Sequence, residues 1–350
     1  MKEKITAKDF FNKLLAGISI AIIVGLIPNA ILGELFKFLS TKVSVFKYLL
    51  LIVQIAQFAV PCLVGALVSM QFKLNPIETA SVTMSTLVAS GVVSFNEDGF
   101  KIAGIGDLIN TIIIAGFAVY LCLLLRGKLG NLTLVLLPMI IVCVAGGIGV
   151  LILPYVKMIT GAIGALIANF TNFKPLIMSI LLSISFAIII ISPMSTVAIA
   201  LAVGLSGLSS GAANIGICAT CASLVVGSLR ANPSGITIAV LLGSPKMFLS
   251  NWIKHPILNL PIILTALISG IFAYIFNIQG TPESAGFGFS GLVGPINAFA
   301  RMEGSAFNNL IIIIIAFFVV PFVAAFVVDY LFVKVLKLYK HEVFKFESED

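Results

Sequence analysis

Long apolar stretches without a charged residue or a histidine divide this chain. Six of them are bounded by Lys13 and Glu34, Lys47 and Lys73, Asp107 and Arg126, Lys128 and Lys157, His255 and Glu283, and Glu303 and Asp329. Each is close to the length of one membrane-spanning helix, which needs about 20 apolar residues, or somewhat longer. A longer one, from Lys174 to Arg230, has room for about two crossings. These stretches predict an all-α polytopic membrane protein with about ten transmembrane helices.

The composition agrees with a membrane location. Hydrophobic residues make up 60% of the 350 residues, charged residues only 10%, and the mean hydropathy is +1.17. Soluble domains are about half apolar and a quarter charged. A separate soluble catalytic domain, a large receptor domain and a nucleic-acid-binding module are therefore excluded. We interpret the formal charge of +7 as a signal for membrane orientation rather than for binding nucleic acid.

Lysines at both ends of the chain predict cytoplasmic termini and hence an even number of spans. They are Lys2, Lys4, Lys8 and Lys13 at the amino end, and Lys334, Lys337, Lys340 and Lys345 at the carboxyl end. Three further lysines, in what should be the first outer loop, disagree with this rule: Lys37, Lys42 and Lys47. We expect three parts: an N-terminal membrane half (1–172, about five spans, for scaffold and dimerisation), a C-terminal half (173–335, for substrate transport) and a short charged cytoplasmic tail (336–350).

Two segments of the C-terminal half are apolar but too rich in glycine and small polar residues for plain helices. The first covers residues 194–216 and the second residues 279–297. Non-helical backbone at membrane depth needs protein or a wet cavity to satisfy its polar groups. We therefore expect both segments to form re-entrant hairpins or broken helices. An external loop is the alternative for the second segment, but such a loop would expose Phe287 and Phe289.

Polar groups inside these segments are the candidate substrate ligands, because buried polar groups in a membrane are costly and often functional. Glu283, beside Thr281 and Ser284, is the leading candidate; its carboxylate is suited to accepting hydrogen bonds from sugar hydroxyls or a proton. A loop carboxylate at the membrane surface is the alternative. Asn214 and Asn297 end the two segments and are expected to hold their tips together, and Ser195 belongs to the first segment.

Two basic residues outside the segments each have two alternative interpretations. His255 lies just before an apolar run, where it serves either as an interfacial structural residue or in proton transfer. Lys246 pairs either with an anionic substrate or Glu283, or extends its amine to the membrane surface. Asp107 and Asn110 begin a span, and Asp107 is expected to cap that helix.

Signatures of catalysis and of cofactor or metal binding are missing from the sequence. It contains no phosphate-binding G-x-x-x-x-G-K-S/T loop, no His-Glu-x-x-His and no G-x-S-x-G. The five cysteines lie in apolar stretches, and Cys218 and Cys221 are interpreted as helix-packing residues rather than redox or metal groups. We therefore expect no cofactor, no metal and no self-contained catalytic site.

Three stretches of the second half resemble a known family. Residues 191–207, Leu242-Gly-Ser-Pro-Lys-Met247 and residues 277–295 are similar to the IIC membrane proteins of the bacterial phosphotransferase system, in the group that includes the perfringolysin regulator-like proteins. The resemblance covers most of the chain. It implies a homodimer in the bacterial cytoplasmic membrane, with ten-helix protomers, two re-entrant hairpins and a carbohydrate bound near mid-membrane.

The resemblance also suggests residue roles and a partner. In glucose-type members, a Gly-x-Thr-Glu-Pro segment supplies a substrate-binding glutamate, assisted by a histidine. Here Gly280-Thr-Pro-Glu283 has proline and glutamate exchanged, and His255 is a looser counterpart. A separate phosphorylated IIB protein would donate the phosphoryl group. The alternatives are a secondary transporter of a small polar or anionic solute with the same fold, and a membrane-bound regulator.

Overall fold

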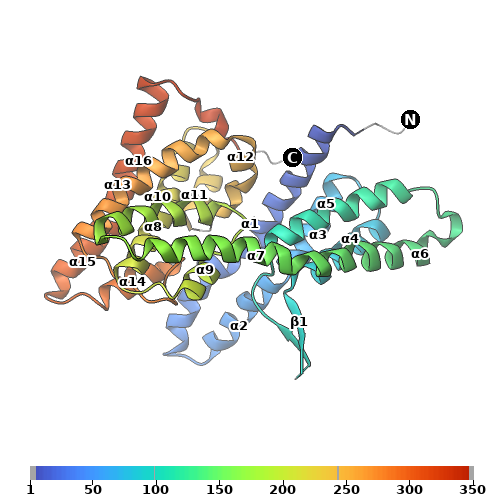
Figure 1. Ribbon diagram of the computed structural model, residues 1–350, viewed down its shortest axis with the longest axis horizontal. Helices are drawn as coiled ribbons and strands as arrows, with labels where there is room; N and C mark the ends of the chain where they lie inside the picture. Colours follow the sequence, from blue (N-terminus) through green and yellow to red (C-terminus); the bar gives the residue numbers. More distant parts are fainter. Residues whose placement is uncertain (1–4, 98, 243, 347–350) are drawn as a thin grey trace. The chain divides into compact units, whose positions relative to one another are not determined.

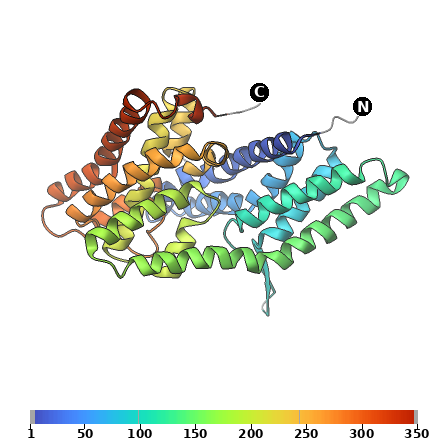
Figure 2. The ribbon, with the colours of Figure 1, turned by 45° about the horizontal axis from the view of Figure 1, so that its top comes forward.

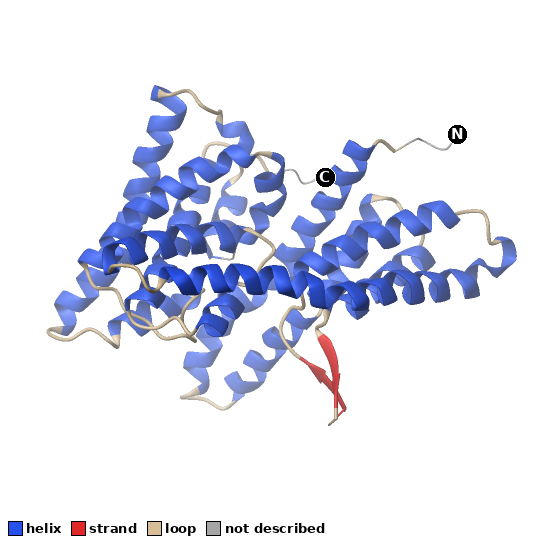
Figure 3. Ribbon diagram, viewed as in Figure 1, coloured by secondary structure: helices blue, strands red, loops and turns tan. Residues whose placement is uncertain are grey.

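The computed structural model describes residues 5–97, 99–242 and 244–346, most of which are helical (Figure 3). Two strands, β1 (Val93–Asn96) and β2 (Gly99–Ile102), form an antiparallel hairpin. The α-helices, in chain order, are α1 (Ala7–Ser40), α2 (Val45–Phe58), α3 (Val60–Gln71), α4 (Pro76–Ser90), α5 (Leu108–Leu125), α6 (Thr133–Ile140), α7 (Gly147–Phe170), α8 (Pro175–Ile191), α9 (Thr196–Val203), α10 (Leu208–Ser228), α11 (Ser234–Leu242), α12 (Leu249–Lys254), α13 (Asn259–Ile275), α14 (Val293–Phe299), α15 (Ala306–Ile314) and α16 (Val320–Tyr330).

The expected all-α membrane protein is confirmed, whereas the count of ten spans is not. By length and composition, six helices in the described part of the chain are able to cross a membrane, or seven if α2 and α3, which are bent by 49°, form one broken span. Helix α8 is apolar but only 17 residues long. The charge-free stretches thus located apolar helices without revealing where each one breaks.

The chain forms two compact units. The first comprises the described residues of 1–29 and 39–159, and the second those of 30–38 and 160–347. In the first unit, α4 packs against α3 and α5. The Asp107 side chain caps α5 by accepting a hydrogen bond from the Asn110 backbone N–H (2.9 Å), as expected. Asn110 Nδ2 in turn donates to the carbonyls of Ala89 (2.6 Å) and Gly149 (2.8 Å).

The second unit is built around α10, whose residues are almost all buried by α8, α13 and α16 (Figures 1 and 2). Small polar side chains fasten these helices: Ser179 Oγ donates to the Gly270 carbonyl and Ser183 Oγ to that of Ala266, both at 2.8 Å. In a membrane, where lipid is as apolar as leucine, close approach and hydroxyl hydrogen bonds hold helices together. Cys218 and Cys221 of α10 are buried among these helices, as their interpretation as packing residues predicts.

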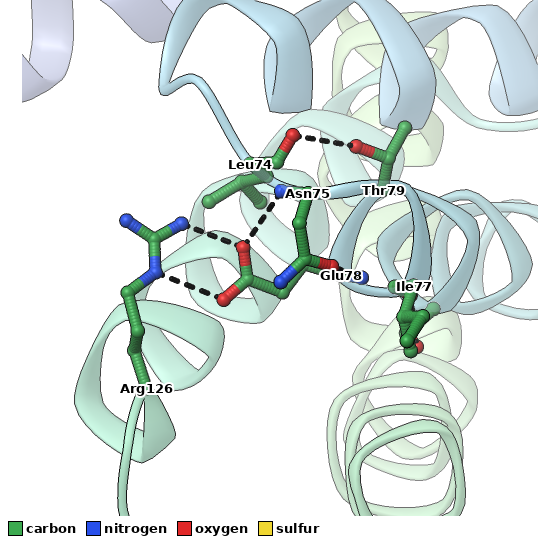
Figure 4. A network of polar contacts seen from close by, with 7 residues as sticks. Leu74, Asn75, Ile77, Glu78, Thr79 and Arg126 are labelled. Carbon is green, nitrogen blue, oxygen red and sulfur yellow. Dashed lines mark hydrogen bonds and ion pairs between the residues drawn. The ribbon is translucent and has the colours of Figure 1, made fainter. Parts of the chain in front are cut away.

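A buried carboxylate joins α4 to the end of α5 in the first unit (Figure 4). Glu78 is 2% exposed and accepts hydrogen bonds from Arg126 Nε (2.9 Å) and Arg126 Nη2 (2.6 Å). Its side chain also accepts from the Asn75 backbone N–H, while the Asn75 side chain accepts from the Glu78 N–H, each at 2.9 Å. This capping box satisfies two otherwise unpaired donors at the start of α4.

The carboxyl-terminal segment packs back onto the second unit. Phe344 is 1% exposed, and its carbonyl accepts a hydrogen bond from Asn232 Nδ2 (2.7 Å). Asn251 Nδ2 donates to the carbonyls of Val343 (3.2 Å) and Lys345 (2.8 Å). His341 Nε2 lies 3.1 Å from the Asp329 carboxylate. Residues 341–345 of the tail are therefore held against the second unit.

The Glu78 site generates a stability prediction. Replacing Arg126 with methionine leaves a buried carboxylate without its counter-charge, which should cost roughly 2–3 kcal/mol. Arg126 is itself 42% exposed, so water screens part of this loss. We expect a lower unfolding temperature for the purified protein, and partial recovery when Glu78→Gln is added.

Lys128→Met provides the control, because Lys128 is an exposed basic residue in the same loop. Equal unfolding temperatures for Arg126→Met and Lys128→Met would mean that the ion pair contributes nothing to stability.

Candidate functional site

The two glycine-rich segments lie side by side within the second unit. In the first, α9 ends before Gly204, whose left-handed backbone stops the helix, and α10 starts again at Leu208. The second runs through turns to the short helix α14. Gly207 N–H donates to the Gly280 carbonyl (2.9 Å), and Gly280 N–H donates back to the Gly207 carbonyl (3.0 Å). Each segment thus satisfies backbone groups that the other leaves open.

Side chains of the first segment make further hydrogen bonds to the backbone of the second. Ser210 Oγ donates to the Thr281 carbonyl and Thr196 Oγ1 to the Gly286 carbonyl, both at 2.8 Å. Asn214 Oδ1 accepts from the backbone N–H groups of Phe287 (3.2 Å) and Gly288 (3.0 Å). The prediction that Asn214 holds the segments together is confirmed.

Asn297 is arranged differently, because its hydrogen bonds stay within the second segment. Its Nδ2 donates to the Val293 carbonyl (3.0 Å), and its Oδ1 lies 3.5 Å from Thr281 Oγ1. The expectation that Asn297 also connects the two tips is not met by these contacts. Asn297 instead bonds to the first residue of its own helix, α14.

The absence of side chains at two glycines permits this close backbone contact. A Cβ atom at Gly211 would lie 1.8 Å from the Ile278 carbonyl oxygen. Gly288 has a φ of +62°, and a Cβ there would lie 2.6 Å from Ile217 Cγ2. Both positions therefore require glycine on steric grounds.

Glu283 stands on a tight turn formed by its two neighbours. Ser284 N–H donates to Thr281 Oγ1 (3.1 Å), and Thr281 N–H donates to Ser284 Oγ (2.9 Å). Both hydroxyls are thus engaged in shaping the turn. The Glu283 side chain is exposed, and no described residue gives it a hydrogen bond or an ion pair. Its carboxylate is therefore available to a ligand.

Lys246 lies buried where α8 ends, in the short turn Pro245–Phe248. It is 6% exposed, and its Nζ donates to the carbonyls of Ser192 (2.6 Å) and Met194 (2.5 Å). A cation at the carboxyl end of a helix is stabilised by the helix dipole and by the unpaired carbonyls. In the described part of the chain Lys246 forms no ion pair with Glu283. Ser195, which follows Met194, caps α9: its hydroxyl accepts a hydrogen bond from the Ala198 N–H (3.2 Å).

His255 lies apart from this arrangement, at the end of α12. It is half-buried, and its backbone N–H donates to the Asn251 carbonyl (2.7 Å). Within the described residues, its ring makes no hydrogen bond or ion pair to either glycine-rich segment. The structure therefore brings Glu283, Thr281, Ser284, Asn297 and Asn214 together, with Lys246 and Ser195 at the break before α9.

Comparison with known proteins identifies the family. Residues 12–346 match the family model described as Phosphotransferase system, EIIC. The chain belongs to this EIIC family. No curated protein and no solved structure matches it significantly. The EIIC chain is thus a membrane component of a phosphotransferase-type transporter, and the narrower likeness to perfringolysin regulator-like proteins stays a prediction.

The second segment of the EIIC chain also borders an apolar cavity of about 430 Å³. It is lined by Phe289–Leu292 of the second segment together with Leu241, Leu242, Phe318 and Phe322. A second cavity of about 420 Å³ lies between α9 and the second half of α7 and is lined mainly by glycine and alanine, with Thr160, Ile199 and Val203. Glu283 lines neither of these two cavities.

Residues that our sequence analysis missed include Thr196, Ser210 and Glu78. The first two are ordinary hydroxyl residues in a stretch rich in them, so only the fold identifies their partners. Glu78 was recognisable in principle, because Asn75-Pro-Ile-Glu78 has the spacing of a capping box. Its pairing with Arg126 depends on the packing of α4 against α5.

The close backbone contact generates a prediction for Gly211. A methyl group there overlaps the Ile278 carbonyl oxygen, and overpacking of this kind costs about 1–3 kcal/mol. Gly211→Ala should therefore lower the unfolding temperature of the EIIC protein and loosen the Gly207–Gly280 pairing. Faster hydrogen exchange at residues 279–288, measured by mass spectrometry, is the expected sign.

Gly235→Ala is the matched control, because no atom lies within 4 Å of the added Cβ. Alanine is also the better helix former by up to about 1 kcal/mol. Unchanged exchange in Gly211→Ala would contradict the steric role of this glycine.

Proposed function

We propose that this EIIC protein binds a carbohydrate beside the paired glycine-rich segments and translocates it for phosphorylation by a separate phosphorylated IIB protein. The proposal rests on the carboxylate of Glu283, which is exposed and, within the described part of the chain, unpaired. Its neighbours Thr281 and Ser284 are hydrogen-bonded within the turn, whereas the carboxylate has no partner among the described residues. A carboxylate accepts hydrogen bonds from sugar hydroxyls.

The other candidate residues have supporting roles in this proposal. Thr281, Ser284 and Asn297 fix the turn that presents Glu283, and Asn214 fixes that turn against α10. Lys246 and Ser195 shape the break between α8 and α9. His255 is proposed as a more distant ligand, reached only when the solute or the segments move, because no described contact joins it to the turn.

Further parts of the proposal follow from the family. We expect a homodimer in the bacterial cytoplasmic membrane with both termini in the cytoplasm, the N-terminal half for dimerisation and the C-terminal half for transport. The two paired segments would be its re-entrant elements. The regulator alternative is less attractive, because Asn232 and Asn251 bind the described part of the tail against the second unit. The second alternative is a secondary transporter, and an uptake experiment distinguishes it from a transporter coupled to phosphorylation.

Uptake into proteoliposomes tests whether transport is coupled to phosphorylation by the IIB protein. Vesicles that contain the protein should accumulate sugar phosphate from a panel of labelled sugars only when phosphorylated IIB protein is supplied inside. Uptake of unmodified solute driven by a proton gradient would favour the secondary transporter. A ligand that binds without any flux would favour the regulator.

Glu283→Gln tests the site. The substitution keeps the shape but removes the charge, and hydrogen bonds to a charged group are worth about 1.5–3 kcal/mol. We therefore expect the dissociation constant for the transported sugar to rise roughly 10- to 100-fold. Isothermal calorimetry on the purified protein measures this directly.

Glu303→Gln removes an exposed carboxylate that follows α14 and serves as the control. We expect its affinity for the sugar to equal that of the unmodified protein. If Glu283→Gln also binds unchanged, the site assignment is wrong.

A further inference from the structure

The β1–β2 hairpin of the first unit carries an apolar face that is largely exposed in the described part of the structure. Its register pairs Val93 with Ile102 and Phe95 with Phe100. Because side chains alternate along a strand, these four residues share one face, and Ser94 and Lys101 lie on the other. The exposed fractions are 74% for Phe95, 81% for Phe100 and 55% for Ile102. The rings of Phe95 and Phe100 contact each other, with centroids 5.2 Å apart.

An isolated two-stranded hairpin in water is at best marginally stable. This one has two exposed aromatic residues, and both strands keep one unpaired edge. Such a hairpin requires a surface that takes up its apolar face.

The hairpin is attached close to the start of a helix that is able to span the membrane. The Ala103 N–H donates to the Val92 carbonyl (3.0 Å), which closes the base of the hairpin, and the Asp107 N–H donates to the Ser90 carbonyl (2.7 Å). The base is thereby fixed to the start of α5, a helix able to span the membrane. Where a spanning helix begins, the water–lipid boundary is close by.

The direction of the hairpin is consistent with this boundary. In Figures 1 and 2 it runs across the direction of α5 rather than along it. A hairpin that crosses a spanning helix extends along the plane of the bilayer. One apolar and one polar face suit an element that lies in the interface, as for amphipathic helices.

We propose that the β1–β2 hairpin lies in the membrane interface, with Phe95, Phe100 and Ile102 inserted among lipid acyl chains and Ser94 and Lys101 facing water. The ligand is the phospholipid bilayer itself. The hairpin face alone is too small to bind a second copy of the chain, because each partner of a stable protein interface supplies about 20–30 residues and this face offers four.

Tryptophan fluorescence tests this proposal. The protein contains a single tryptophan, so Trp252→Phe gives a background without one. In this background, Phe95→Trp and Ser94→Trp place a reporter on opposite faces of the hairpin. Each protein is reconstituted into vesicles of phosphatidylcholine and phosphatidylglycerol, with or without phosphatidylcholine brominated near the headgroup end of its acyl chains.

The expected result differs between the two faces. Phe95→Trp should emit at shorter wavelength and lose much of its intensity to brominated lipid, with little loss to aqueous iodide. Ser94→Trp should show the reverse. Both substitutions lie on a surface hairpin, so the parent protein and the two variants should share one unfolding temperature.

Two outcomes would overturn the proposal. Quenching of Phe95→Trp by iodide as strong as that of Ser94→Trp would place the aromatic face in water. Protection of Phe95→Trp from both quenchers would place it against protein, as in contact with a second copy.

Discussion

The structure of the second unit depends on how backbone polar groups are satisfied where helices are interrupted. In a membrane no water is at hand to hydrogen-bond a free N–H or carbonyl. The two glycine-rich segments meet this requirement for each other: Gly207 and Gly280 exchange a pair of hydrogen bonds, and Asn214 supplies an acceptor for two further N–H groups. This pairing fixes the second segment, and with it the turn that carries Glu283, against α10.

The pairing also explains the position of the candidate ligand. A segment attached by its backbone leaves its turns free to present side chains, and Glu283 stands on such a turn. Lys246 stabilises the break between α8 and α9 by donating hydrogen bonds to carbonyls at the end of α8. The burial of the Lys246 amine therefore has a structural explanation that requires no anionic substrate. The proposed carbohydrate therefore needs no anionic group to satisfy Lys246.

Charge-free stretches and glycine content were sufficient to predict a helical membrane protein and to locate both interrupted segments. They were insufficient to count the spans, because breaks such as the 49° bend between α2 and α3 contain no charge. Asn214 was predicted correctly from its place at the end of a segment. Asn297 has an equivalent place, yet it turns inward to Val293, and sequence patterns do not determine such a choice between two nearby acceptors. The Glu78–Arg126 pair depends on residues 48 positions apart and appears only once α4 and α5 pack together.

An experimental structure of the protein in lipid, with a transported sugar bound, tests the central claim most directly. The account predicts density for the sugar beside the paired segments, within hydrogen-bond distance of the Glu283 carboxylate. Sugar density at another place, with Glu283 surrounded by bulk water, would contradict it.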